Sequence, residues 1–545
     1  MSQKLRIALA QINCMVGDFA LNRAKILACI DDAIKLKADI IAFPELAVTG
    51  YPPEDLLLKP KFIQDNLNVI KEIARKVQCI IAVVGFVEKD GDKLYNAAAV
   101  IHQGKIKGIA RKIFLPNYGV FDEKRYFYSG QKPLVIKIGK LTFGVNICED
   151  IWHKDGPTSR QAKLKARLIL NINASPYYAG RIKEREEIIR KQAKVNKIFI
   201  AYTNLVGGQD ELVFDGQSMI ADASGRVIAR AEAFKEDILV RDLDLPGALS
   251  EEKKPALPKN TIKTLDPVTE VYQALVLGLR DYVSKNGFER VVIGLSGGVD
   301  SSLVATLAVD ALGKNNVVGI FMPTRHSSKE SEEYARRLAE NLGIKFAVIP
   351  IEQTYNMYLA VLDPHFAGTS RNITEENLQA RIRGNILMAF SNKFGWMVLT
   401  TGNKSEMSTG YATLYGDMAG GLAVIKDVPK VLVYKLAQYR NSISKIIPEQ
   451  VLTRPPTAEL RPNQKDSDTL PPYEVLDPIL KAYVEEDQEL EKIVKLGFDK
   501  ETVARVLRMV DGSEYKRRQS PPGIKITPKA FGRDRRMPIT NRYKG

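Results

Sequence analysis

The chain has 545 residues, 45% hydrophobic and 26% charged, which is typical of globular proteins and too long for a single core, so we expect two domains. No apolar run reaches the roughly 20 residues of a membrane helix, no signal-peptide pattern is present and four cysteines make no disulfide framework; we expect a cytoplasmic protein without a membrane partner. The net charge is +16, but its basic residues alternate with acidic ones, as in KEREEIIRKQAK around Arg185, which we interpret as a solvated helix face rather than a nucleic-acid surface.

The first half of the chain alternates strands and helices, which predicts an α/β layered domain over residues 1–245. The expected strands are Leu5–Ile12, Asp39–Phe43, Ile80–Val87, Ala97–His102 and Leu141–Ile147, and Leu21–Leu36 has helical spacing. Residues 246–267 mix proline, glycine and charge without periodicity, so we expect a linker there.

The second half, residues 268–545, also alternates strands and helices and predicts a parallel sheet. The expected helices are Val268–Asn286, Ser301–Leu312 and Lys329–Leu342, and the expected strands are Arg290–Leu295 and Val317–Met322. The segment Thr453–Asp477, rich in proline, aspartate and glutamine, is expected to be a long loop followed by two more helices. Glycines in Ser408–Gly421 indicate a mobile loop.

A candidate nucleophile, Cys148, follows a predicted strand in NICEDIW, where backbone N–H groups can meet a developing oxyanion. An ordinary thiol, with a pKa of about 8.5, needs a base at neutral pH. Glu45 in FPELAVTGY could be that base, and Lys112 in RKIFLPNYG could supply positive charge. The other cysteines, Cys14, Cys29 and Cys79, are expected to be buried core residues.

These three contexts, with the opening IALAQINCMVGD, resemble the nitrilase, or carbon-nitrogen hydrolase, superfamily over most of residues 1–245. The resemblance implies an αββα sandwich in which Glu45 is the general base, Cys148 forms a thioester and Lys112 stabilises the tetrahedral intermediate. In the glutaminase branch, the matching glutamine-binding residues are Tyr118, Ser175 and Arg181. A substrate carboxylate also suits an arginine on chemical grounds.

The motif GLSGGVDSS follows a strand and opens a helix, where glycines, hydroxyls and the helix N-terminus favour an anion. It lacks the lysine of a Walker A loop and resembles the pyrophosphate loop of ATP pyrophosphatases. Asp300 in this motif is a candidate Mg²⁺ ligand, because a cation that bridges phosphates prefers carboxylate oxygens.

Three further segments are similar to NAD synthetases: TTGNKSEMSTGYATLYGDMAGGLAVIKDVPK at Thr400–Lys430, ENLQARIRGNILM at Glu376–Met388, and the tail EYKRRQSPPGIKITPKAFGRDRRMPITN. With the amidase half, the chain resembles the glutamine-dependent NAD synthetases of bacteria. The resemblance implies a Rossmann-like ATP-pyrophosphatase fold in the second half. The residues implied to contact ATP are Gly294, Leu295, Ser296, Gly297, Gly298, Val299, Asp300, Ser301 and Thr401. Those implied to contact deamido-NAD are Asn377, Glu406, Tyr411, Ala412, Thr413, Leu414 and Lys516, with Asp300 and Glu406 near Mg²⁺. The dense basic cluster around Lys516 and Arg535 suits a polyphosphate ligand.

The resulting hypothesis is a ligase that hydrolyses glutamine, adenylates deamido-NAD with ATP and amidates it to NAD, with ammonia passing between the sites. Its partners would be these small molecules and further copies of the chain in a homo-oligomer, with no nucleic acid. Three alternatives stay open at this point: a glutamine-fed ligase for another carboxylate, a nucleotide-binding regulator without activity, and a nucleic-acid-binding protein suggested by charge alone.

Overall fold

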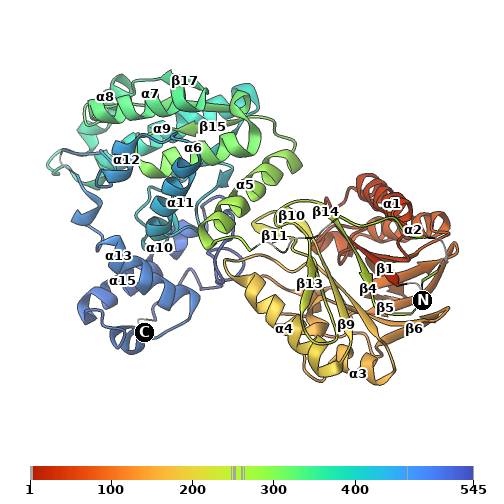
Figure 1. Cartoon of the computed structure of the whole chain (residues 1–545). Coiled ribbons are helices and arrows are strands. Elements are labelled where there is room, and N and C mark those ends of the chain that lie inside the picture. Colours follow the sequence, from red (N-terminus) through yellow and green to blue (C-terminus); the bar gives the residue numbers. More distant parts are fainter. Residues whose placement is uncertain are drawn as a thin grey trace. The chain divides into compact units, whose positions relative to one another are not determined.

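The computed structural model describes residues 4–246, 248–249, 253–258, 260, 262, 264–462 and 464–543, so part of the expected linker 246–267 lies outside the described residues. The chain separates into two compact units (Figure 1). The first comprises Met1–Gln209 and Val213–Leu265, and the second comprises Asp210–Leu212 and Asp266–Gly545. Among the described residues, none of the helices has the length and apolar character required to cross a membrane.

The first unit contains two six-stranded sheets. Their strands, with the short pair β10 and β11, are β1 (Leu5–Gln11), β2 (Ile40–Ala42), β3 (Ile81–Asp90), β4 (Lys93–His102), β5 (Lys105–Arg111), β6 (Leu134–Ile138), β7 (Leu141–Ile147), β8 (Leu168–Asn173), β9 (Phe199–Asn204), β10 (Val206–Gln209), β11 (Leu212–Asp215), β12 (Met219–Ala221), β13 (Val227–Arg230) and β14 (Asp237–Leu243). The helices are α1 (Phe19–Lys35), α2 (Pro60–Lys76), α3 (Pro157–Lys163) and α4 (Arg181–Asn196).

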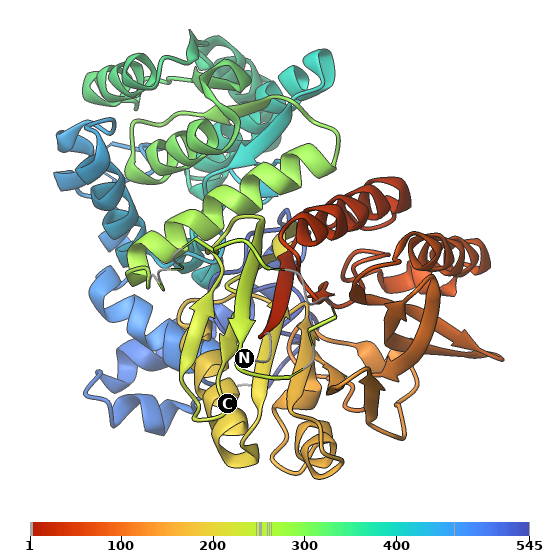
Figure 2. The ribbon, with the colours of Figure 1, turned by 45° about the vertical axis from the view of Figure 1, so that its right-hand side comes forward.

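The two sheets pack face to face between two helical layers. Their strand orders are β14-β1-β2-β3-β4-β5 and β13-β12-β9-β8-β7-β6, with parallel strands at the centre of each. Ile7 and Val83 of the first sheet share a core with Phe143 and Leu170 of the second. The helices α1 and α2 lie side by side over the first sheet, and α4 packs on the outer face of the second (Figures 1 and 2). This arrangement confirms the expected αββα sandwich.

The second unit is built on one parallel sheet with many helices. The strands are β15 (Val291–Gly294), β16 (Val317–Phe321), β17 (Lys345–Val348), β18 (Met397–Thr400) and β19 (Leu422–Ala423). The helices are α5 (Pro267–Lys285), α6 (Val299–Leu312), α7 (Lys329–Leu342), α8 (Glu352–Leu362), α9 (Ile373–Phe394), α10 (Lys404–Thr409), α11 (Lys430–Ile443), α12 (Glu449–Thr453), α13 (Tyr473–Leu480), α14 (Leu490–Val494), α15 (Lys500–Gly512) and α16 (Glu514–Arg517).

The sheet order is β17-β16-β15-β18-β19, and every pairing is parallel, which confirms the expected sheet. A separate apolar cluster joins α13, α14 and α15 near the C-terminus, where Figure 1 shows α13 and α15 together. The loop expected over Thr453–Asp477 is partly wrong. The loop ends at Pro472, because this residue is the N-cap of α13. The helices α14, α15 and α16 follow α13, so more than two helices come after the loop.

Candidate active sites

A buried ion pair joins two of the predicted catalytic residues in the first unit. Glu45 follows β2, Lys112 follows β5, and the Lys112 Nζ lies 2.7 Å from the Glu45 Oε1. The same carboxylate accepts hydrogen bonds from the Asn96 side chain at 2.7 Å and from the Ala174 backbone at 2.9 Å. Both side chains are fully buried, so the Glu45 oxygens are held in one orientation.

A second carboxylate, which the sequence analysis did not single out, completes this cluster. Glu123 accepts a hydrogen bond from the Lys112 Nζ at 2.8 Å and another from the Tyr51 hydroxyl at 3.1 Å. Burial alone would lower the pKa of Lys112, but Glu123 and Glu45 together raise it well above its ordinary value. Lys112 therefore keeps its positive charge at neutral pH.

The nucleophile candidate, Cys148, occupies a strained turn at the end of β7. Its φ is +45°, a left-handed conformation that non-glycine residues seldom adopt, and it begins a short 3₁₀ turn, Cys148–Ile151. The Asp150 carboxylate holds this turn by accepting from the backbone N–H of Ile147 at 3.1 Å and of Phe114 at 2.9 Å. Burial, with the Glu45 charge, raises the pKa of the Cys148 thiol well above its ordinary value. The resting thiol is therefore protonated and needs a base.

The residues expected to bind glutamine lie on segments next to Cys148. The Tyr118 hydroxyl donates to the Glu149 carboxylate at 2.9 Å. Arg181, the first residue of α4, lies over the Trp152 ring and donates to Glu184 at 2.6 Å. The Ser175 hydroxyl accepts from the Arg185 Nε at 3.1 Å. Glu149 and Arg181 thus place an acidic and a basic side chain near the nucleophile. This pair suits a substrate that carries one positive and one negative charge.

Two expectations about the first unit are wrong in part. The helix α4 does have an exposed face, which includes Lys183, Glu184 and Glu187. Arg185 is not on a solvated face: it is fully buried, pairs with Asp215 at 2.6 Å and donates to the backbone carbonyl of Ser175. Burial alone would lower the pKa of Arg185, but Asp215 raises it. Among the free cysteines, Cys14 is buried, but Cys79 is exposed and Cys29 only partly buried, so these two are not core residues.

In the second unit, the GLSGGVDSS motif forms a loop between β15 and α6, as expected. Gly297 has a φ of +78°, and a Cβ there would lie 2.4 Å from the Ser331 carbonyl oxygen, so only glycine fits. The Ser301 hydroxyl accepts from the Ser296 backbone N–H at 3.2 Å and donates to the Gly298 carbonyl at 3.1 Å. The loop is therefore preorganised at a helix N-terminus, where anions bind.

The two carboxylates proposed near Mg²⁺ share one partner, Lys430. Its Nζ lies 2.5 Å from Asp300 and 3.4 Å from Glu406, and Asn403 also donates to Asp300 at 3.0 Å. Burial and the nearby Asp300 charge raise the pKa of Glu406, although Lys430 opposes the shift. Two crowded carboxylate oxygens that attract a cation fit Mg²⁺, which takes one or two carboxylates and completes its shell with phosphates and water. Lys430 ends the Thr400–Lys430 segment but was given no role, because its contact with Asp300, 130 residues away, is visible only in the fold.

A cavity of about 270 Å³ brings together much of the predicted synthetase site. Nine of its lining residues were predicted: Gly294, Leu295, Ser296, Asp300, Ser301, Thr401, Glu406, Tyr411 and Ala412. Gly297, Gly298, Val299, Asn377, Thr413, Leu414 and Lys516 are not among the lining residues. Three of these lie close by: Thr413 donates to Asn377 at 2.8 Å, and Lys516 donates to the Ala412 carbonyl at 2.9 Å.

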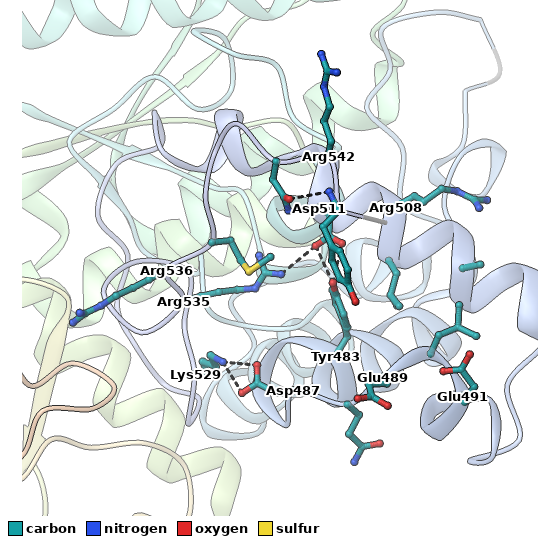
Figure 3. A pocket seen from close by; sticks show the side chains of 18 residues that line it. Tyr483, Asp487, Glu489, Glu491, Arg508, Asp511, Lys529, Arg535, Arg536 and Arg542 are labelled. Atoms are coloured by element: carbon teal, nitrogen blue, oxygen red, sulfur yellow. Dashed lines mark hydrogen bonds and ion pairs between the residues drawn. The ribbon is translucent and has the colours of Figure 1, made fainter. Parts of the chain in front are cut away.

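Two arginines of the basic tail are engaged within the protein. Arg517 is buried and donates to the Ser408 carbonyl at 2.6 Å and to Glu514 at 2.8 Å. Arg535 pairs with Asp511 in a second cavity of about 1050 Å³. In Figure 3, Arg535 and Tyr483 converge on Asp511, whereas Arg508, Arg536 and Arg542 point away from one another. These contacts of Arg517 and Arg535 fasten the tail to the helices, and the expected polyphosphate contact stays a prediction.

The comparisons with known proteins cover the whole chain. A carbon-nitrogen hydrolase family model matches residues 6–249, and an NAD synthase model matches residues 271–520. The glutamine-dependent NAD(+) synthetases of Thermotoga maritima and Aquifex aeolicus are each 50% identical over 99% of this chain, covering 99% and 100% of theirs. A solved structure of the Acinetobacter baumannii glutamine-dependent NAD+ synthetase with bound ADP is 43% identical, covers 99% of both chains and superposes with a TM-score of 0.77.

The fold and the family models define a ligase that joins a carbon-nitrogen hydrolase half of the nitrilase type to an NAD synthase half. The chain belongs to the family of glutamine-dependent NAD(+) synthetases. Of the alternatives left open by the sequence, neither a ligase for another carboxylate nor a nucleic-acid-binding protein is favoured by this full-length similarity.

Proposed function

We propose that residues 1–245 hydrolyse glutamine and residues 268–545 use the released ammonia to convert deamido-NAD into NAD⁺, joined by a linker at 246–267. The observation that carries the first half is the buried contact of Lys112 with Glu45, two residues far apart in sequence, close enough to Cys148 to shift its pKa. The second half is supported by the cavity that combines the loop after β15 with Thr401 and Glu406.

In the glutaminase step, Glu45 takes the Cys148 proton while the sulfur attacks the side-chain amide carbon of glutamine. The charge of Lys112 stabilises the oxyanion, and Glu45 passes its proton to the amide nitrogen so that ammonia leaves. Water, deprotonated by Glu45, then releases glutamate from the thioester. Tyr118, Ser175 and Arg181 orient the amino acid, with Arg181 binding the α-carboxylate and exchanging its contact with Glu184.

In the synthetase step, the nicotinate carboxylate of deamido-NAD attacks the α-phosphorus of ATP, and pyrophosphate leaves. Ammonia then attacks the activated carbonyl carbon and displaces AMP, giving the amide. Residues Gly294–Ser301 and Thr401 bind ATP, while Asn377, Glu406, Tyr411–Leu414 and Lys516 bind deamido-NAD. Asp300 and Glu406 would hold Mg²⁺, which neutralises phosphate charge when bound. The ADP in the Acinetobacter baumannii structure supports the use of ATP.

The proposal also includes a cytoplasmic homo-oligomer. Three apolar residues on two helices are well exposed. Met357 (65%) and Val361 (65%) lie on α8, and Ile373 (66%) is the first residue of α9. Apolar surface of this kind is suited to burial against a second copy of the chain. Light scattering of the full chain and of Val361→Asp would test this interface.

The test of the function is NAD⁺ formation from deamido-NAD, ATP and Mg²⁺, with glutamine or ammonium chloride as parallel nitrogen sources. Formation of NAD⁺ and AMP from both sources supports the proposal. A well-folded protein that hydrolyses glutamine but makes NAD⁺ from neither source would refute the synthetase half and leave the glutaminase half standing.

A further inference from the structure

A guanidinium faces the synthetase cavity without a carboxylate partner. Arg383, on α9, lines the cavity, and its Nε donates to the Met322 carbonyl at 2.9 Å. Within the described part of the chain, Arg383 forms no ion pair. The carboxylate whose charge acts on Arg383, Glu459, also lines the cavity, but it pairs with Arg454 at 2.6 Å and accepts from the Ser331 hydroxyl at 3.0 Å.

A second buried cation, Lys430, contacts two carboxylates that line the cavity and is already neutralised, unlike Arg383. Lys430 is held between Asp300 and Glu406. Burial lowers the pKa of Arg383 to about 10, and the distant Glu459 charge only partly opposes this. Removing a cation from water without a partner costs free energy, so an anion that enters the cavity would recover a favourable interaction there.

The position of Arg383 points to ATP rather than to deamido-NAD. Its neighbour on the helix, Arg381, donates to the Leu414 carbonyl at 3.2 Å and so faces the segment proposed for deamido-NAD. Arg383 faces Met322, just after β16. A Cβ on Gly294 would meet the Met322 side chain at 3.5 Å and that of Leu387, one turn after Arg383, at 3.4 Å. Arg383 therefore borders the start of the GLSGGVDSS loop.

We propose that Arg383 is a further substrate-binding residue whose guanidinium donates to an α- or β-phosphate oxygen of ATP. This inference rests on the proposed function, because it takes the cavity to be the ATP site. Arginine suits the task, since its planar donors match phosphate oxygens and its Nε contact with Met322 fixes the plane. The site would thus combine Arg383 on one side of the nucleotide with the metal-binding carboxylates and the glycine loop elsewhere in the cavity.

The experiment compares adenosine, AMP and ADP as probes by calorimetric titration of the full chain and of its Arg383→Met and Arg383→Lys variants. We expect Arg383→Met to weaken ADP binding by about 10- to 100-fold, the loss of one charge-assisted hydrogen bond, and to leave adenosine binding unchanged. If the variant loses the preference for AMP over adenosine, Arg383 contacts the α-phosphate. If it loses the preference for ADP over AMP, Arg383 contacts the β-phosphate. Arg383→Lys should retain part of the preference.

A matched control is Lys393→Met, an exposed cation near the end of the same helix, which should bind all three probes like the wild type. An equal loss for adenosine and ADP in Arg383→Met would overturn the proposal by showing a structural role, as would unchanged ADP affinity. A rise confined to the KM for deamido-NAD, in ammonium-dependent synthesis, would assign Arg383 to the other substrate. If the wild type binds none of the probes, the proposed ATP site itself fails.

Discussion

Removing the charge of Lys112 should destabilise the first unit as well as stop glutamine hydrolysis. The substitution Lys112→Met leaves Glu45 and Glu123, both buried, without the cation that contacts them at 2.7 and 2.8 Å. Breaking a buried ion pair by removing one partner costs about 3–5 kcal/mol. At roughly 2–4 °C per kcal/mol for a domain of this size, the melting temperature of the unit should fall by about 6–20 °C.

The loss of stability in Lys112→Met should depend on pH, and the pKa of Glu123 sets the direction of this dependence. Burial, with the Glu45 charge, raises the pKa of Glu123 above its ordinary value even with Lys112 opposing the shift. Without Lys112 the pKa rises further, so the folded state binds protons that the unfolded state releases above the ordinary glutamate pKa of about 4.3. The stability of the variant should therefore fall as pH rises from 5 to 8, and the deficit relative to wild type should be smallest at pH 5.

Calorimetry at pH 5 and pH 8 measures both effects, with Lys107→Met as the control, because Lys107 lies exposed on β5, the strand that Lys112 follows. The double variant Lys112→Met, Glu123→Gln should recover part of the loss, since it removes one uncompensated charge. A deficit below about 2 °C, or one that is equal at the two pH values, would refute the view that Lys112 neutralises this pair.

Three other predictions concern the separate chemistry of the two units. Cys148→Ala should abolish glutamine-dependent NAD⁺ formation and leave ammonium-dependent formation largely intact in parallel assays; loss of both would contradict the division of labour. Asp300→Ala should eliminate both activities, and retained ammonium-dependent synthesis would remove Asp300 from the metal-binding role. Because burial and Glu45 raise the pKa of the Cys148 thiol, its alkylation by iodoacetamide, followed by peptide mass spectrometry, should keep rising well above pH 9; a plateau near the ordinary thiol pKa of about 8.5 would contradict this.

The sequence located the candidate sites because their residues follow predicted strands. Glu45 follows β2, Cys148 follows β7 and the loop at Gly294 follows β15, each at the carboxyl end of a parallel strand. Glu45 and Cys148 end strands of different sheets in the first unit, and these strand ends meet across the sandwich, since the Ala174 backbone after β8 donates to Glu45. An apolar run that ends in a polar residue is visible in one sequence, which is why the strands and these positions could be predicted together.

Buried charges were harder to predict, and Arg185 shows why. Its neighbours in KEREEIIRKQAK are charged, so composition indicated a solvated face. Spacing carries the opposite signal, since Ile182, Ile189 and Ala193 are buried on α4 at intervals that place Arg185 on the same face. Periodicity could therefore have placed Arg185 inside, although its partner Asp215 could not have been identified without the fold.

Both sites contain a buried lysine between two carboxylates, but the lysine is expected to stay in place in one site and to be displaced by Mg²⁺ in the other. Lys112 contacts Glu45 and Glu123, and the glutaminase chemistry needs its charge to stay there. Lys430 contacts Asp300 and Glu406, the two carboxylates proposed for Mg²⁺. Mg²⁺ and the charged Lys430 side chain would therefore compete for the same carboxylate oxygens. Lys112 was predicted from its motif, whereas Lys430 and the pairing of each lysine with two carboxylates are seen only in the fold. A sequence motif can therefore identify a carboxylate. Whether the lysine beside it stays paired or is displaced depends on the packing around the pair and on the charge of the substrate or ion that binds there.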